Sequence, residues 1–200
     1  MATRSEVSVA IEDDPRRRQL LEAALATFVR FGFRKTSMEE IARAAQVSRQ
    51  GLYLHFSTKE ELFRKGAEFA LSEALKAAKR CLDDPGLELE ARLVGALDAW
   101  LGQYVGIMSS DNDLFDASKR LIGPMMDDYE ERFSDALTRA IRSSDLVTAH
   151  RASGLSARQL ADTLQAAARG HKYTAASRKD FVHGVTLAVK ALCTPLKGLE

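Results

Sequence analysis

Apolar side chains recur every three or four positions along almost the whole chain, which is the period of an amphipathic helix. Segment 15–31 shows the pattern first, because Leu21 and Phe28 fall on one face of it. Pro15 stands where the first turn of a helix tolerates proline, and Gly32 follows where a left-handed C-cap is expected. The sequence therefore predicts a helix over 15–31.

Polar residues at fixed spacing predict where other helices begin. Ser37/Glu40, Thr58/Glu61 and Ser156/Gln159 have the spacing of a capping box, and Ser48 and Ser177 are further candidate N-caps. Helices are predicted over 15–31, 37–45, 48–55, 58–82, 89–108, 114–121, 124–141, 156–173 and 177–192, with a loop over 143–154. Residues 1–14 are expected to be a flexible tail. The predicted fold is all-α, with about nine helices and no sheet.

Composition narrows the class of protein. The 200 residues are 46% hydrophobic and 28% charged, as in a globular chain with one or two small domains. Cys81 and Cys193 belong to no metal-ligand or redox motif, so we expect reduced thiols. Acidic residues interrupt the first 14 positions and no apolar run reaches 18 residues. The sequence therefore predicts a soluble, intracellular protein without a signal peptide or membrane span.

Residues 37–56 hold two short predicted helices separated by a four-residue turn. Apolar anchors let the second helix pack steeply across the first and point its N-terminal end outward, as in a helix-turn-helix. These anchors are Ile41, Ala45, Val47, Leu52 and Phe56. Periodicity alone is equally consistent with an ordinary helical hairpin that has a solvated polar face.

The second of these helices carries side chains that suit DNA. Arginine donates two hydrogen bonds to guanine or phosphate, and glutamine pairs with adenine. Lys59 stands at a helix N-terminus, which favours anions, so it is a predicted phosphate contact together with Tyr53 and His55. The predicted DNA-binding set is Ser37, Ser48, Arg49, Gln50, Tyr53, His55 and Lys59.

The sequence of this segment resembles that of a known family, with the matching residues at the same spacing. The matching stretches are Gly32-Phe-Arg-Lys-Thr-Ser-Met-Glu-Glu-Ile41-Ala42 and Val47-Ser-Arg-Gln-Gly-Leu-Tyr-Leu-His-Phe56-Ser-Thr-Lys59. Over about residues 16–64 the chain closely resembles the DNA-binding domain of the tetracycline-repressor (TetR) family. The resemblance implies a homodimeric, cytoplasmic transcription regulator, most often a repressor that binds a palindromic DNA operator and is released by a small-molecule ligand.

Two residues of this segment depart from the family pattern, and three arginines stand at the start of its first predicted helix. Gln46 stands where the family turn usually has glycine, and a left-handed non-glycine residue costs about 1 kcal/mol. Gly51 replaces the common Thr or Ser and removes a hydroxyl contact. The three arginines at 16–18 face the unfavourable end of a helix dipole. They indicate either a nearby DNA backbone or a solvated basic turn.

The resemblance implies a DNA-binding domain over 15–65 and a ligand-binding and dimerisation domain over 66–200. Large, adaptable side chains in the middle of the chain suit a pocket for an apolar or aromatic ligand, although side chains of this kind at helical spacing more often form an ordinary core. The predicted pocket set is Trp100, Tyr104, Met108, Phe115, Met126, Tyr129, Phe133 and His171. The last helices are expected to pair across a dimer, or else to pack within one subunit, through Phe181, Val185, Ala188, Val189 and Leu192.

The formal net charge of +1 hides an uneven distribution. Residues 1–14 hold one basic and four acidic residues, 15–65 hold eleven and five, and 66–200 hold seventeen and nineteen. The basic excess thus coincides with the candidate helix-turn-helix.

Two other classes of function compete with a ligand-responsive DNA-binding protein. A small all-α enzyme lacks a supporting pattern, since the four histidines are not spaced four apart and no glycine-rich phosphate loop occurs. We therefore expect no enzyme activity, metal or cofactor, and no membrane partner. A DNA-binding protein regulated by a protein partner, or by oxidation of Cys81 or Cys193, remains an alternative.

Overall fold

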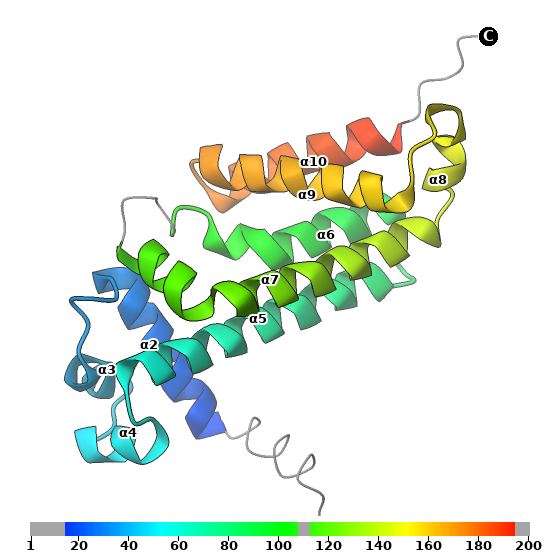
Figure 1. Ribbon diagram of the computed structural model, residues 1–200. Coiled ribbons are helices and arrows are strands. Elements are labelled where there is room, and N and C mark those ends of the chain that lie inside the picture. Colours follow the sequence, from blue (N-terminus) through cyan, green and yellow to red (C-terminus); the bar gives the residue numbers. More distant parts are fainter. Residues whose placement is uncertain (1–14, 108–112, 195–200) are drawn as a thin grey trace, which may run out of the picture. The chain divides into compact units, whose positions relative to one another are not determined.

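The computed structural model describes residues 15–107 and 113–194, and all regular elements in these ranges are helical (Figure 1). They are α2 (Pro15–Phe31), α3 (Met38–Ala44), α4 (Arg49–His55), α5 (Lys59–Asp83), α6 (Leu89–Leu101), α7 (Asp113–Arg142), α8 (Leu146–Ala149), α9 (Ala157–Thr174) and α10 (Arg178–Cys193), with 3-10 turns η1 (Gly102–Tyr104) and η2 (Arg151–Ser153). The predicted all-α fold is confirmed. The tail expected over 1–14 lies outside the described residues.

The chain divides into two compact units. The first comprises Met1–Ala70 and Ser110–Gly123, and the second comprises Leu71–Ser109 and Pro124–Glu200, including the stretches outside the described residues. Helix α5 begins in the first unit and ends in the second, and so does α7.

Three phenylalanine rings form the centre of the first unit. They belong to Phe28 in α2, Phe33 in the segment after α2, and Phe63 in α5. All three side chains are buried, and their ring centroids lie 5.2 to 5.5 Å apart. Ile41 of α3 and Leu52 of α4 are fully buried in the same unit. Two predicted anchors of the helix-turn-helix therefore occupy its core.

The turn between α3 and α4 is a Schellman motif. The Val47 N–H donates to the Ala42 carbonyl at 2.9 Å, and the Gln46 N–H donates to the Arg43 carbonyl at 3.2 Å. Gln46 has a φ of 57°, the one positive φ of a non-glycine residue in the described part of the chain. The left-handed turn forms without the glycine that usually occupies this position.

The core of the second unit draws apolar side chains from α5, α6, α7, α9 and α10. Helices α9 and α10 run side by side, and α10 also packs against α6 (Figure 1). At the centre, the rings of Trp100 and Phe133 stack with centroids 5.1 Å apart. Arg178 of α10 donates two hydrogen bonds to Asp98 of α6, at 2.9 and 2.7 Å, which fixes these two helices at one end.

Some helix boundaries differ from the prediction. Gly123 and Pro124 were expected to separate two helices, but α7 is a continuous helix with Pro124 inside it. A proline within a helix removes one backbone donor, and because Pro124 is exposed, solvent can satisfy the carbonyl left without a partner. The helix predicted over 89–108 ends at Leu101, and the loop over 143–154 contains α8 and η2.

Candidate nucleic-acid interface

Helix α4 buries one side and exposes the rest. Leu52 is fully buried, whereas Arg49, Gln50 and His55 are exposed and Tyr53 is 41% exposed. The Arg49 guanidinium lies 5.6 Å from the centre of the Tyr53 ring, a cation–π contact that holds these two side chains together. These four predicted DNA-binding residues are therefore accessible to solvent.

Two serines of the predicted set act as helix caps. Ser48 accepts a hydrogen bond from the Gly51 N–H at 2.9 Å at the start of α4. Ser37 accepts from the Glu40 N–H at 3.2 Å, while the Glu40 carboxylate accepts from the Ser37 N–H at 2.7 Å. The predicted capping box at the start of α3 is thus confirmed, and the hydrogen bond from the Ser37 backbone lowers the pKa of Glu40.

Charged side chains hold the segment between α2 and α3 from two sides. Asp113, the first residue of α7, accepts hydrogen bonds from the N–H groups of Phe33 at 3.0 Å and Arg34 at 2.6 Å. Lys59, the first residue of α5, donates to the carbonyls of Phe33 at 2.9 Å and Thr36 at 3.0 Å. The position of α3 and α4 relative to α2 therefore depends on these two side chains.

The structure gives Lys59 a positioning role. Its ammonium bonds backbone carbonyls and lies 4.5 Å from the centre of the Phe33 ring, so the contact with phosphate stays a prediction. Gly32 has a φ of +82°, and a Cβ there would collide with the Asp113 carboxylate. Sequence reasoning missed Asp113, because its partners lie about eighty positions away and no local motif marks it.

Two of the arginines at 16–18 pack on rings of the first unit. The Arg17 guanidinium lies 5.1 Å from the Phe56 ring centre, and that of Arg18 lies 5.2 Å from the Phe69 ring centre. Arg18 also donates to Glu22 at 3.0 Å. These contacts supply a local stabilisation that the sequence did not indicate.

Leu54 is a second residue that sequence reasoning missed. It lies on α4 and is 82% exposed. Its position two residues after the buried Leu52 places it on the opposite side of the helix, and this spacing was available as a signal.

The predicted pocket residues are only partly brought together. Trp100, Tyr129 and Phe133 are buried in the core of the second unit, and Met126 is half-buried against it. Phe115, in contrast, belongs to the first unit. Met108 lies outside the described residues, and the half-buried Tyr104 and His171 lie in η1 and α9.

The predicted pairing residues of α10 divide into two groups. Phe181, Val185 and Val189 are buried in the core of their own unit, as in the alternative of packing within one subunit. Ala188 and Leu192 are half-buried. The large apolar side chain that α10 exposes is Leu187, which is 56% exposed.

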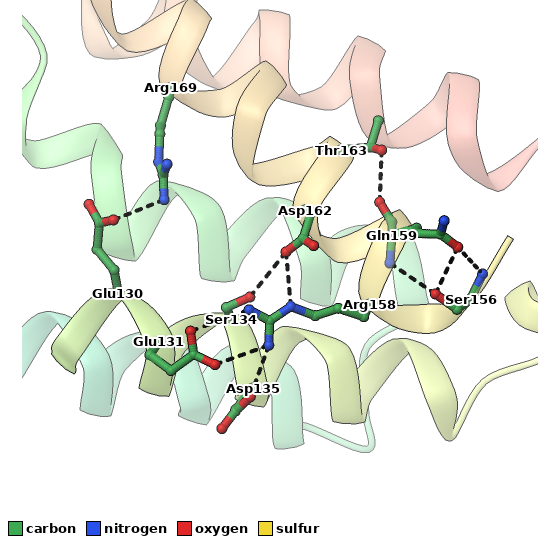
Figure 2. A network of polar contacts seen from close by, with 10 residues as sticks. All are labelled: Glu130, Glu131, Ser134, Asp135, Ser156, Arg158, Gln159, Asp162, Thr163 and Arg169. Atoms are coloured by element: carbon green, nitrogen blue, oxygen red, sulfur yellow. Dashed lines mark hydrogen bonds and ion pairs between the residues drawn. The ribbon is translucent and has the colours of Figure 1, made fainter. Parts of the chain in front are cut away.

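A polar network joins α7 to α9 in the second unit (Figure 2). Arg158 of α9 reaches Glu131 at 3.2 Å, Asp135 at 3.3 Å and Asp162 at 3.1 Å. Its hydrogen bond to Glu131 lowers the pKa of that carboxyl. Arg158 thereby links α9 to α7 on an exposed surface.

Two other kinds of site are absent from residues 15–107 and 113–194. No three His, Cys, Asp or Glu side chains lie close enough to hold a metal ion. No helix in the described ranges is both long and apolar enough to cross a membrane.

Known proteins resemble this chain most clearly over its N-terminal segment. Residues 20–65 match the family described as bacterial regulatory proteins, tetR family. YfiR, an uncharacterized HTH-type transcriptional regulator of Bacillus subtilis, is 43% identical over 63 residues, which are 32% of this chain and 31% of YfiR. The probable acrEF/envCD operon repressor of Escherichia coli K12 is 43% identical over 49 residues, 24% of this chain and 22% of that protein. The chain thus matches less than a third of the length of either relative.

The likeness of fold extends further than the likeness of sequence. The structure of the fatty acid degradation regulator FadR from Bacillus halodurans has a TM-score of 0.67 and 14% identity, over 92% of this chain and 98% of that chain. The fold of both units thus recurs in a solved structure, although the sequences have diverged. The matched residues 20–65 form most of α2, all of α3 and α4 and the start of α5, so the likeness to the tetR family of bacterial regulatory proteins lies in these helices.

Proposed function

We propose that this protein is a homodimeric, DNA-binding transcriptional repressor of the bacterial cytoplasm. It binds a palindromic operator and leaves it when a small apolar or aromatic ligand binds the second unit. The observation that carries the proposal is the accessible face of α4, where Arg49, Gln50 and Tyr53 stand together beyond a buried Leu52. Arginine and glutamine are the side chains that read guanine and adenine in the major groove.

A symmetric dimer would explain why the operator is a palindrome. Two copies related by a two-fold axis place their recognition helices about 34–36 Å apart, one turn of DNA, and so bind a palindrome. Because Phe181 and Val185 are occupied by the subunit's own core, we assign the contact between copies to the outer face of α9 and α10. Tyr173, 69% exposed, and Leu187 are the large apolar side chains on those two helices that solvent reaches.

The region around Trp100 and Tyr104 is our candidate ligand site. Lys172 of α9 lies 5.7 Å from the centre of the Tyr104 ring, and burial lowers the pKa of Lys172 while it raises that of Tyr104. A half-buried amine beside aromatic rings suits an aromatic ligand that carries a polar or anionic group. Release follows only if the ligand binds the DNA-free conformation more tightly than the DNA-bound one.

Regulation by thiol oxidation has less support. Burial raises the pKa of the Cys193 thiol, with a smaller contribution from Glu90, and oxidants react with the thiolate. A raised pKa lowers the thiolate fraction at neutral pH. The structure therefore offers no activated cysteine at this position.

The test begins with selection of duplexes from a random DNA library by the purified full chain. We expect a palindromic consensus, and a molar mass of twice the chain by light scattering. At fixed salt, Tyr53→Ala should weaken binding to all duplexes, whereas Gln50→Ala should change the preferred bases. Arg151→Ala, an exposed residue of η2 in the second unit, is the matched control.

Two outcomes bear directly on the proposal. Failure to enrich any sequence, together with unchanged binding by Tyr53→Ala, would show that α4 is not the DNA-contacting surface. A reporter gene placed behind the selected duplex then distinguishes repression from activation. Release by aromatic acids or amines, but not by diamide oxidation, supports ligand control over thiol control.

A further inference from the structure

Leu54 is exposed in a way that the fold does not require. Its 82% exposure is the highest among the large hydrophobic side chains exposed in the described part of the chain. Leaving a leucine in water forgoes the free energy that its burial would provide. A single exposed leucine is ordinary on a protein surface, but this one lies on the helix that presents Arg49 and Gln50.

The helical period places Leu54 together with Gln50. Each is two positions from Leu52, and two residues correspond to about 200° around an α-helix. Leu52 is fully buried, so Gln50 and Leu54 point directly away from the core. They are four residues apart, which makes them neighbours on one face, separated by about 6 Å along the helix axis.

The neighbouring row on α4 is formed by Arg49 and Tyr53. Their cation–π contact holds them side by side. The helix therefore exposes two rows, one cationic and aromatic, the other an amide followed by an aliphatic side chain. A helix that enters the major groove with its buried side outward brings the Gln50 and Leu54 row closest to the base edges.

The major groove offers one kind of apolar group, the 5-methyl of thymine. Adenine, in the same base pairs, presents the N6 and N7 atoms that a glutamine amide pairs with. Successive base pairs rise by about 3.4 Å, so a 6 Å separation spans two of them. The basic excess of residues 15–65, eleven basic against five acidic, favours DNA over an apolar protein surface as the partner of this face.

We infer that Leu54 is a specificity-determining residue that contacts a thymine methyl group, beside an A·T pair read by Gln50. The inference rests on the proposed DNA-binding function and names a chemical feature of the operator. It requires thymine at a fixed position in each half-site. Removal of that methyl group alone should weaken binding.

Deoxyuridine provides the test, because it pairs like thymine but lacks the methyl group. Each thymine of the strongest duplex recovered by selection is replaced in turn by deoxyuridine, in both half-sites, and the Kd is measured at fixed salt. For the full wild-type chain, one position should weaken binding about fourfold per half-site, as expected for one buried methyl-sized group. Leu54→Ala should bind both duplexes equally at that position, and Leu54→Met should retain discrimination.

The control is Leu87→Ala, which truncates an exposed leucine between α5 and α6. It should discriminate like the wild type. Equal binding of thymine and deoxyuridine duplexes by the wild type, or unchanged discrimination in Leu54→Ala, overturns the inference while sequence-specific binding keeps the proposed function. Loss of self-association in Leu54→Ala without DNA also overturns it, because Leu54 would then contact a second copy. Failure to select any duplex removes both proposals together.

Discussion

The two units of this protein differ in the contacts that hold their helices together. In the first unit, charged and hydroxyl side chains bond the backbone, as Asp113, Lys59, Ser37 and Ser48 do. The second unit also has such contacts, as between Arg92 and the Leu82 carbonyl, but adds ion pairs between separate helices, as Arg178 makes with Asp98, over a larger apolar core.

Helix length explains the difference. Helices α3 and α4 have seven residues each, too few to be stable alone, and they offer few side chains for burial. The serine caps and the hydrogen bonds of Asp113 and Lys59 to the backbone stabilise this region while the outer side of α4 stays exposed. The longer helices of the second unit bury whole apolar faces. The first unit thus keeps the outer side of α4 free, whereas the second commits its apolar helix faces to its own core.

The largest effect is expected in the core of the second unit. Phe133→Ala removes a fully buried ring stacked on Trp100, and we expect the second unit to lose about 3–5 kcal/mol of unfolding free energy. Trp100 is the one tryptophan of the sequence, so its fluorescence during urea unfolding reports on that unit. Phe31→Ala, which truncates an exposed ring, is the control. A loss below about 1 kcal/mol would contradict the role of this stack.

The next effect separates positioning from phosphate contact at Lys59. Lys59→Met leaves two carbonyls without their charged donor, and should destabilise the first unit by about 2 kcal/mol. Lys65→Met, whose ammonium pairs with Glu68 on the surface, should change stability little. Circular dichroism melting gives the stability, and DNA affinity against salt gives the second readout. If Lys59→Met lowers the salt slope by about 1 with no change in stability, Lys59 contacts phosphate instead.

A smaller effect is expected for the surface network of the second unit. Arg158→Ala removes ion pairs to α7, and exposed pairs of this kind contribute little to the free energy of unfolding. The loss should shrink further at 1 M salt, where exposed charges are screened. Arg132→Ala, which breaks a pair within α7 alone, is the matched control. A large loss of stability that salt does not reduce would show that Arg158 acts by packing.

The smallest effect concerns the pH dependence of the α3 cap. The Ser37 backbone hydrogen bond lowers the pKa of Glu40 in the folded state, so this carboxylate stabilises the protein at neutral pH. That contribution is lost as the pH falls through the lowered pKa. The stability difference between the wild type and Glu40→Gln should therefore narrow under acid conditions, as measured by thermal melting. A difference that widens as the pH falls would contradict this sign.

The sequence predicted those parts of the site that local chemistry decides. The caps Ser37 and Ser48 and the side of α4 that carries Arg49 and Gln50 follow from residue types at short spacing, whereas the left-handed conformation of Gln46 was expected only from the family resemblance. The role of Asp113 could not be predicted from the sequence. Its carboxylate accepts a hydrogen bond from the Phe33 N–H, and only the folded chain brings these two residues together. The α7 boundary was missed for the opposite reason. Proline signals a break locally, but α7 runs on through Pro124, with Ile122 buried before it and Tyr129 buried after it.

The sequence by itself therefore determined the helices and a basic excess in the N-terminal segment, because periodicity and caps act over a few residues, and its family resemblance indicated the helix-turn-helix. Only the tertiary structure decided which distant groups the side chains meet. It turned Lys59 inward to carbonyl groups and buried Phe181 and Val185 in their own unit. The physical reason is that burial and hydrogen-bond partners come from distant segments of the chain. Neither is encoded in the spacing of neighbouring residues.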